Sequence, residues 1–395
     1  MRLNSLMFSL LVVCLSYGPV LAQAADSDKA ATAPATAPAS APASSPAAEI
    51  TATLAQMEAL FAPPDQPLPA AQMMALWTER MEKVIELGQQ VEKRQPNNPG
   101  LAKVRQIMLI AAGNLASKDG SEAARQRSVE IAERIMASSF APEQKLNADF
   151  YIMRTKLGID GGSPAQDAEK QIREFIRRYI GTTVTADSLQ AAVVLAMGVK
   201  QPALANEFMQ LLYSKYPSPE VRVFLRETGY FVGKPFTASL TRLDGKTLRL
   251  PESLKGRVIV VDFWATWCPP CVESVPAMKK LYDKYHVKGV EFVGVSLDID
   301  KSKVQDFVLS SNTAWMQTFS GKGADDPTAS QYGISAIPAI WVIGRDGKVI
   351  TDSAEVLSPE PTLELAIQEA LGELPTTKPA ATQPSTAPAA SPVKR

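Results

Sequence analysis

The sequence predicts two folded parts in tandem, an all-α part built of helical hairpins and an α/β part with one mixed central sheet. The chain has 395 residues, which exceeds one ordinary domain and suffices for two sizeable cores. Apolar residues recur at helical spacing through residues 49–228, whereas residues 229–374 alternate strand-like and helix-like runs. These three observations set the expected fold class before any motif is considered.

The composition excludes several classes of function. Lys and Arg together number 41, as do Asp and Glu, so the chain has no basic excess with which to bind nucleic acid. Its single histidine, His286, excludes a multi-histidine metal site. Only Cys268 and Cys271 lie outside the N-terminal apolar run, which leaves too few ligands for the usual four-ligand zinc site. We therefore expect no metal and no cofactor.

Residues 1–24 have the pattern of a secretory signal peptide. Arg2 supplies the positive charge, Leu6 to Leu15 form a short apolar core, and Ala22-Gln23-Ala24 is a small-x-small cleavage site. An uncleaved anchor is the open alternative. We therefore expect an oxidising compartment outside the cytoplasm, the periplasm or its equivalent, with the chain either free or tethered to the membrane.

Two low-complexity segments flank the folded parts. Residues 25–48 are mostly Ala, Pro, Thr and Ser, and residues 375–395 are similar. Neither contains enough apolar surface to offset the entropy of ordering the chain. We expect the first to be a disordered linker and the second a disordered tail.

Residues 49–228 are expected to be helical almost throughout. Between Trp77 and Leu87, apolar residues recur every three or four positions with charged residues between them. Breaks rich in Pro and Gly separate the runs, which favours antiparallel hairpins, and residues 203–221 are similar to the end of a tetratricopeptide-type (TPR-like) repeat. Two interpretations stay open: a surface that holds a partner protein, or a packed domain without a binding role. Further helices are expected at about 101–117, 121–138, 143–157, 165–180, 186–199 and 202–216.

The α/β part, residues 229–374, begins with two strand-like runs joined through the turn Asp244-Gly245. The continuous apolar run 257–265 that follows is typical of a strand buried inside a sheet. Along the chain, the elements are expected as strands 236–240, 247–250 and 257–265, helix 269–286, strand 290–297, helices 301–310 and 326–332, strands 339–343 and 348–351, and helix 360–371.

The segment Trp267-Cys268-Pro269-Pro270-Cys271 stands where the buried strand gives way to a helix. Cys268 is thus at the helix N-terminus, where free N–H groups and the helix dipole favour a thiolate. Thiols in such sites titrate at ~3.5–7.5 instead of ~8.5, and the thiolate is the nucleophile in disulfide exchange. Cys271, one turn on, is placed to attack the mixed disulfide. A purely structural disulfide is disfavoured, because so short a loop restrains little of the unfolded chain.

Short motifs follow one another in a fixed order through about residues 230–372. They are Gly233-Lys-Pro-Phe, Leu243-Asp-Gly-Lys, Leu254-Lys-Gly-Arg-Val, Phe263-Trp-Ala-Thr-Trp-Cys-Pro-Pro-Cys, Val293-Gly-Val-Ser-Leu-Asp and Tyr332-Gly-Ile-Ser-Ala-Ile-Pro. In these motifs the chain resembles the thioredoxin superfamily, and within it the TlpA/ResA-like thiol-disulfide oxidoreductases of bacterial envelopes. The resemblance implies a thioredoxin-like fold with a helix-containing insertion at about 298–320. The helical part lies outside it.

The resemblance also implies how the site is built. Pro338 is expected to be a cis-proline facing the cysteines, and the backbone of Ile337 to pair with a bound substrate peptide. Trp267 is expected to contact the same substrate. Three prolines are expected to support the site, the first two in the opening turn of the helix and the third as a kink: Pro269, Pro270 and Pro276.

Two positions depart from the family pattern. Many members have Asn in the buried strand and Glu three residues after the second cysteine, where this chain has Asp262 and Ser274. Burial should raise the pKa of Asp262, which makes its carboxylate a useful acceptor for the proton of Cys271. We assign Asp262 as the acid-base group and keep Glu273 as the alternative. A solvated Asp262 is disfavoured by its apolar neighbours.

The sequence therefore predicts a thiol-disulfide oxidoreductase of the cell envelope that reduces protein disulfides through Cys268 and Cys271. By family resemblance, apocytochrome c is a candidate substrate, and a membrane-linked donor is expected to supply the electrons. Two alternatives stay open: a thiol-dependent peroxidase of the redoxin type, and a non-enzymatic adaptor in which the helical part binds a protein partner.

Overall fold

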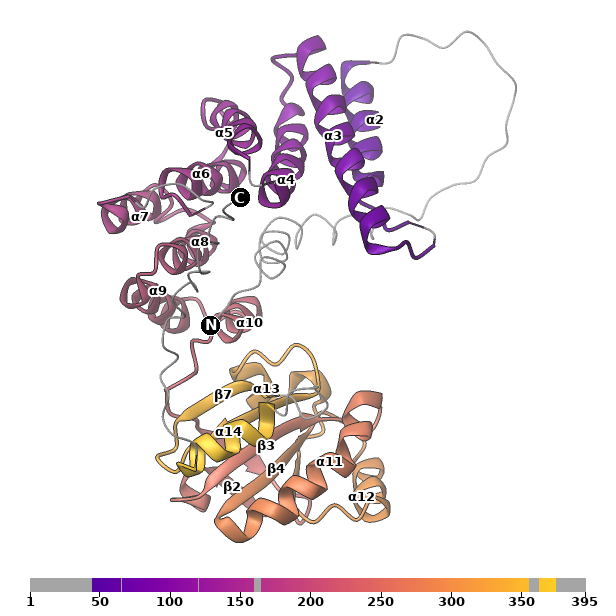
Figure 1. The fold of residues 1–395 in the computed structure, drawn as a ribbon, viewed down its shortest axis with the longest axis vertical. Helices are drawn as coiled ribbons and strands as arrows, with labels where there is room; N and C mark the ends of the chain where they lie inside the picture. The colour runs from indigo at the N-terminus through magenta and orange to yellow at the C-terminus, as the bar shows by residue number, and fades with distance from the viewer. Residues whose placement is uncertain (1–44, 65, 120, 160–164, 355–361, 374–395) are drawn as a thin grey trace, which may run out of the picture. The chain divides into compact units, whose positions relative to one another are not determined.

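The computed structural model describes residues 45–64, 66–119, 121–159, 165–354 and 362–373 (Figure 1). The signal-like segment, most of the expected linker and the tail 375–395 lie outside the described residues. The chain divides into two compact units between Lys215 and Tyr216. Within the described ranges, none of the helices combines the length and apolar character that a membrane span requires.

The described part of the first unit is helical, as predicted. Successive helices pack side by side, among them α4 with α5, α5 with α6, and α8 with α9. They are α2 (Pro46–Ala59), α3 (Ala70–Arg94), α4 (Leu101–Asp119), α5 (Glu122–Met136), α6 (Pro142–Lys156), α7 (Ala168–Arg177), α8 (Thr185–Gly198) and α9 (Pro202–Lys215). Tetratricopeptide character stays a prediction.

Close packing joins the first helices of this unit. Met81, Val84 and Met108 are fully buried in one apolar cluster between α3 and α4. A Cβ added at Gly88 would overlap the side chain of Met108, so the glycine lets the two helices approach closely.

A buried carboxylate fixes the next part of the unit. Asp149 of α6 accepts hydrogen bonds from Nε and Nη2 of Arg178 at 2.7 and 2.9 Å. It also accepts one from the hydroxyl of Tyr179 at 3.0 Å. These bonds tie α6 to the chain that follows α7.

The second unit contains the predicted α/β part. Its central sheet has the strand order β5-β4-β3-β6-β7, in which β3, β4 and β5 run parallel and β6 is antiparallel to both β3 and β7. The strands are β1 (Ala238–Thr241), β2 (Thr247–Leu250), β3 (Val258–Trp264), β4 (Val290–Ser296), β5 (Met316–Phe319), β6 (Ala339–Ile343) and β7 (Val349–Ala354). The helices are α10 (Pro219–Glu227), α11 (Pro269–Tyr285), α12 (Lys301–Ser310), α13 (Pro327–Gln331) and α14 (Thr362–Leu371). This is the mixed-sheet, thioredoxin-like architecture that was predicted.

Helices cover the sheet because its strands are apolar on both faces. On one face Val258 and Val260 of β3 share an apolar cluster with Met278 of α11 and Leu363 of α14. On the other face Trp341 of β6 packs against an aromatic group that includes Phe236 and Tyr332, with ring centroids 5.8 and 5.0 Å away. Every residue of β3 is buried as a result.

Three boundaries differ from the sequence-based expectation. α2 begins at Pro46, inside the expected linker 25–48, where Ser45 caps it by accepting a hydrogen bond from the N–H of Ala48. The second compact unit includes α10, ahead of the predicted boundary at 229, because α10 packs on the chain after α13. There Arg226 donates to the carbonyl of Gly333 at 3.3 Å.

The third difference is β5, an edge strand within the expected insertion 298–320. Its run Met-Gln-Thr-Phe is short and half polar, so it gives no strand signal of its own. It forms because it pairs with β4, and its buried hydroxyl at Thr318 donates to the carbonyl of Gly294 at 3.0 Å.

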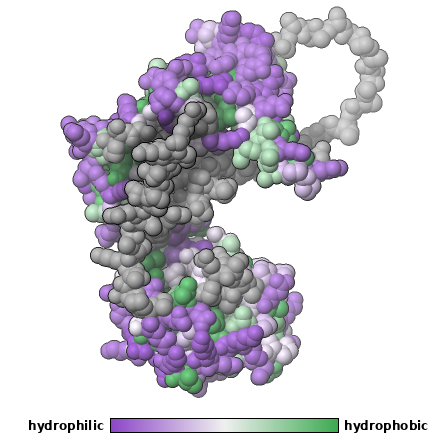
Figure 2. Space-filling model, viewed as in Figure 1, coloured by the Kyte–Doolittle hydropathy of each residue, from purple (hydrophilic) through white to green (hydrophobic). Residues whose placement is uncertain are grey.

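The visible surface of the described residues is mostly hydrophilic, with scattered apolar side chains (Figure 2).

Candidate active site

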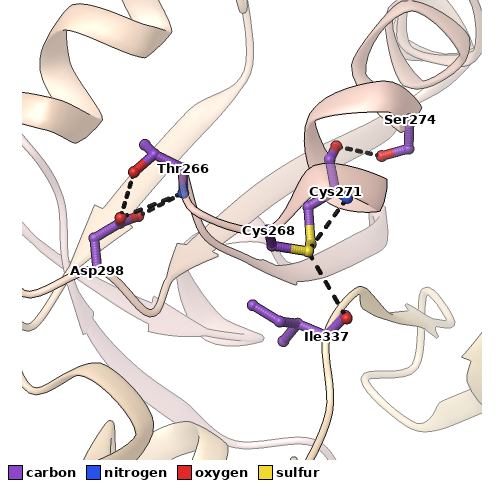
Figure 3. Close-up of a disulfide and its surroundings, with 6 residues drawn as sticks. All are labelled: Thr266, Cys268, Cys271, Ser274, Asp298 and Ile337. Atoms are coloured by element: carbon purple, nitrogen blue, oxygen red, sulfur yellow. Dashed lines mark hydrogen bonds between the residues drawn. A yellow bond between two sulfur atoms is a disulfide. The ribbon is translucent and has the colours of Figure 1, made fainter.

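A disulfide between Cys268 and Cys271 closes the first turn of α11 (Figure 3). Cys268 is the N-cap residue of the helix, and its Sγ accepts a hydrogen bond from the N–H of Cys271 at 3.3 Å. A sulfur in this position receives a free helix N–H and the positive end of the dipole, both of which stabilise a thiolate once the disulfide is reduced. Both cysteines are buried in this oxidised form, with 4% and 2% of their surface exposed. The exposed fraction therefore does not distinguish Cys268 from Cys271, whereas their positions in the helix do.

Of the predicted substrate-binding residues, Ile337 contacts this disulfide through its backbone, and Pro338 follows it in the chain. The Ile337–Pro338 bond is cis, as expected, and the carbonyl oxygen of Ile337 lies 3.8 Å from the Sγ of Cys268 (Figure 3). Pro338 is exposed, and Trp267, next to Cys268 in the chain, has 64% of its surface exposed. The buried sulfur pair is thus bordered by accessible, largely apolar side chains.

Asp262 lies inside the sheet and not at a solvated strand end. It is in the middle of β3, opposite Gly294 of β4 and Ile340 of β6. Side chains alternate along a strand, so Asp262 shares the face of Val258 and Val260 that α11 covers. Only 8% of its surface is exposed, and burial raises its pKa from 3.8 to about 7. Within the described chain, no hydrogen bond reaches its carboxyl group to offset the burial.

The alternative acid-base residues are less well placed. Glu273 is exposed on the surface of α11. Ser274, which stands at the family's glutamate position, is buried and donates from Oγ to the carbonyl of Cys271 at 2.7 Å. His286 follows the last turn of α11 and stacks on Tyr282 with ring centroids 4.7 Å apart. Asp262, in contrast to the exposed Glu273, is buried, and burial raises its pKa.

The prolines lie where the sequence predicted them. Pro269 opens α11, where its missing N–H costs no hydrogen bond, and Pro270 follows it on the surface. Pro276 is inside α11, which continues through it to Tyr285. The described residues contain no cluster of three or more Cys, His, Asp or Glu side chains able to hold a metal ion.

One buried acid near the site was given no role from the sequence. Asp298, two residues after the end of β4, accepts hydrogen bonds from the N–H and Oγ1 of Thr266 at 3.0 and 2.6 Å (Figure 3). Thr266 lies two residues before Cys268, so this contact holds the loop that leads into the helix. Asp298 is the last residue of one of the family motifs, and that position was the one sequence signal that it has a role at the site.

Comparisons with known proteins show what the chain is similar to. Residues 231–367 match the redoxin family. Thiol-disulfide oxidoreductase ResA of Bacillus cereus is 33% identical over 142 residues, which are 36% of this chain and 76% of that protein. The ResA of Bacillus thuringiensis subsp. konkukian is 34% identical over 113 residues, 29% of this chain and 63% of that protein. The chain therefore spans less than two thirds of this second relative.

A solved structure is similar to part of the chain. It is described as a putative thiol:disulfide interchange protein DsbE from Chlorobium tepidum, and is 31% identical with a TM-score of 0.31. The match covers 36% of this chain and 97% of that one.

Proposed function

The chain belongs, through its second unit, to the family of ResA-like thiol-disulfide oxidoreductases, and on that premise we propose that it reduces disulfides in exported proteins. The observation that carries the proposal is the Cys268–Cys271 disulfide at the N-terminus of α11, beside the cis bond of Pro338. A sulfur pair in this position is readily switched between dithiol and disulfide.

Two exchange steps complete the reaction. The Cys268 thiolate attacks one sulfur of the substrate disulfide, a mixed disulfide forms, and the other substrate sulfur leaves as a thiolate. Cys271 then loses its proton and attacks the Sγ of Cys268, which releases the second substrate thiolate and restores the Cys268–Cys271 disulfide. The dithiol loses two electrons and two protons, and the substrate gains them as two thiols.

Asp262 takes the proton of Cys271 in the second step. Its burial beneath α11 and its pKa of about 7 support this role, because an acceptor is most effective when its pKa is near the working pH. Glu273, on the exposed surface of the same helix, does not share this environment.

The substrate binds across the rim of the site. An extended peptide pairs with the backbone of Ile337 and packs on Trp267 and Pro338, which leaves its disulfide over Cys268. Trp267 is 64% exposed and so is free to make this contact.

The location and partners follow from the N-terminal pattern and the family. The signal-like segment 1–24 directs the chain to the periplasm or another extracytoplasmic compartment. Apocytochrome c is the candidate substrate, and a membrane-linked dithiol donor returns the two electrons. The helical unit binds a protein partner.

Insulin-disulfide reduction, measured beside peroxide consumption, tests this function. We expect the full chain with dithiothreitol to reduce insulin, the Cys268→Ser variant to be inactive, and peroxide consumption to stay at the background rate. Peroxide consumption that depends on Cys268 without insulin reduction would establish a peroxidase instead. Inactivity in both assays would leave the adaptor interpretation.

A further inference from the structure

Asp298 is a buried carboxylate on which several donors converge. It is 2% exposed and lies two residues after the end of β4. Its Oδ2 accepts from the N–H of Thr266 at 3.0 Å and its Oδ1 from the Oγ1 of Thr266 at 2.6 Å (Figure 3). Its Oδ2 also accepts from the Oγ of Ser296 at 2.8 Å. Hydrogen bonds to an ionised acceptor are about twice as strong as neutral ones, so the carboxylate is satisfied where it lies.

These bonds fix the segment that leads into the redox helix. The N–H of Leu297 donates to the carbonyl of Trp264 at 2.8 Å, which ties the end of β3 to the end of β4. One residue after Leu297, Asp298 accepts hydrogen bonds from both the backbone N–H and the hydroxyl of Thr266. The N–H of Cys268 donates a hydrogen bond to the carbonyl of Ala265 at 3.2 Å. The short loop is therefore anchored at both ends and places Cys268 at the start of the helix.

The position of Cys268 decides how well its sulfur is stabilised. The Sγ accepts from the N–H of Cys271 only while Cys268 keeps the extended N-cap conformation, with φ −98° and ψ 102°. A loop free to move would lose this geometry for part of the time. The thiolate would then lose its hydrogen bond from the N–H of Cys271 and accept one from water in its place.

We propose that Asp298, acting through Thr266, is a positioning residue that holds Cys268 at the helix N-cap and so sets its reactivity as a thiolate. The inference rests on the proposed function only in taking Cys268 as the attacking thiol. Asp298 touches no reacting atom, and its effect passes through the loop.

The charge of Asp298 supplies a test of this reasoning. A carboxylate near a thiolate would by itself disfavour the thiolate, so removing the charge would make Cys268 ionise at lower pH. Loss of positioning has the opposite sign, because the sulfur loses its helix N–H. Asp298→Asn cannot accept from all the donors, since one of its oxygens becomes an NH2 group. Thr266→Val removes the hydroxyl donor without changing any charge, and Thr266→Ser is its matched control.

The experiment measures iodoacetamide alkylation of Cys268 against pH in the reduced full chain, with Cys271→Ser as the common background. We expect Thr266→Val and Asp298→Asn to move the midpoint of the profile to higher pH. The rate near neutral pH should fall about fivefold, the size of one ordinary hydrogen bond, and the rates should converge at alkaline pH. Thr266→Ser should follow the parent.

An unchanged midpoint in both variants would overturn the proposal, and so would a shift to lower pH in Asp298→Asn. A lower melting temperature without a midpoint shift would also overturn it, because it would show a merely structural role. The insulin assay on the parent is independent: if the parent fails there while the midpoints shift, the proposed function fails and the positioning role stands.

Discussion

Replacing Asp262 by Asn should remove a large part of the pH dependence of stability in the second unit. The substitution is nearly isosteric, and it removes the one ionisable group in β3. The pKa of Asp262 is about 7 in the folded protein because burial disfavours the charged form, against 3.8 when the group is solvated. Between these values the folded chain binds more protons than the unfolded chain. Its free energy of unfolding therefore falls as the pH rises, and levels off above about 7.

The shift of about three pKa units sets the size of this effect. Each unit corresponds to ~1.4 kcal/mol, so the full difference is about 4 kcal/mol. Raising the pH from ~5 to ~8.5 crosses about two of these units, which predicts a loss of about 3 kcal/mol attributable to Asp262. In Asp262→Asn that part of the loss should disappear.

Urea unfolding followed by tryptophan fluorescence measures the effect in the oxidised full chain. Of its five tryptophans, only Trp77 lies in the first unit, so the signal mainly reports the second. Glu273→Gln is the matched control, because Glu273 is an exposed carboxylate on α11, and it should keep the parent's pH dependence. A parent and an Asp262→Asn variant that lose equal stability between the two pH values would refute the assignment of a buried, protonated carboxyl group.

Three further predictions test separate parts of the molecule. Gly294→Ala should destabilise the second unit by about 1–3 kcal/mol, because the new Cβ would overlap the side-chain amide of Gln317, which accepts a hydrogen bond from the indole N–H of Trp264 at 2.9 Å and so has no freedom to move away; an unchanged urea midpoint would count against the close packing. Asp149→Ala should destabilise the helical unit by about 1–3 kcal/mol in a circular-dichroism melt, since it leaves three donor groups of Arg178 and Tyr179 without their acceptor. Glu169→Ala on the surface should have little effect, and equal melts would disprove this anchor. Trp267→Ala should raise KM for insulin severalfold and leave the reduction of a small aromatic disulfide nearly unchanged. Leu309→Ala, at another exposed apolar residue, is the control. An equal loss of activity on both substrates would show that Trp267 takes part in the chemical step and not in substrate binding.

Local sequence patterns predicted most of the second unit, because most of its strands and helices each have a recognisable sequence signal. The apolar run of β3 and the Pro-rich start of α11 each determine their own element. β5 was missed for the opposite reason: Gln317 and Thr318 are buried polar residues, and only pairing with β4 makes them a strand. α10 was assigned to the helical part because its sequence is helical, whereas its place depends on contacts with Gly333, more than a hundred residues away along the chain.

The features of the site likewise divide into those that local sequence predicted and those that depend on distant contacts. Cys268, Cys271 and Pro338 were found because their chemistry depends on spacing and on a family pattern. The burial of Asp262 was predicted from its apolar neighbours, and the structure confirms it. The contact between Thr266 and Asp298 was not predicted, because it joins residues 32 positions apart and either side chain alone suggests an ordinary loop.

The central claim is that Cys268 attacks the substrate and Cys271 resolves the intermediate. Mass spectrometry of the reduced full chain after incubation with oxidised insulin tests it most directly, with Cys271→Ser and Cys268→Ser compared side by side. The account predicts that Cys271→Ser accumulates a mixed disulfide at Cys268, which dithiothreitol reverses, and that Cys268→Ser accumulates none. A mixed disulfide at Cys271 in the Cys268→Ser variant, with none in Cys271→Ser, would contradict it.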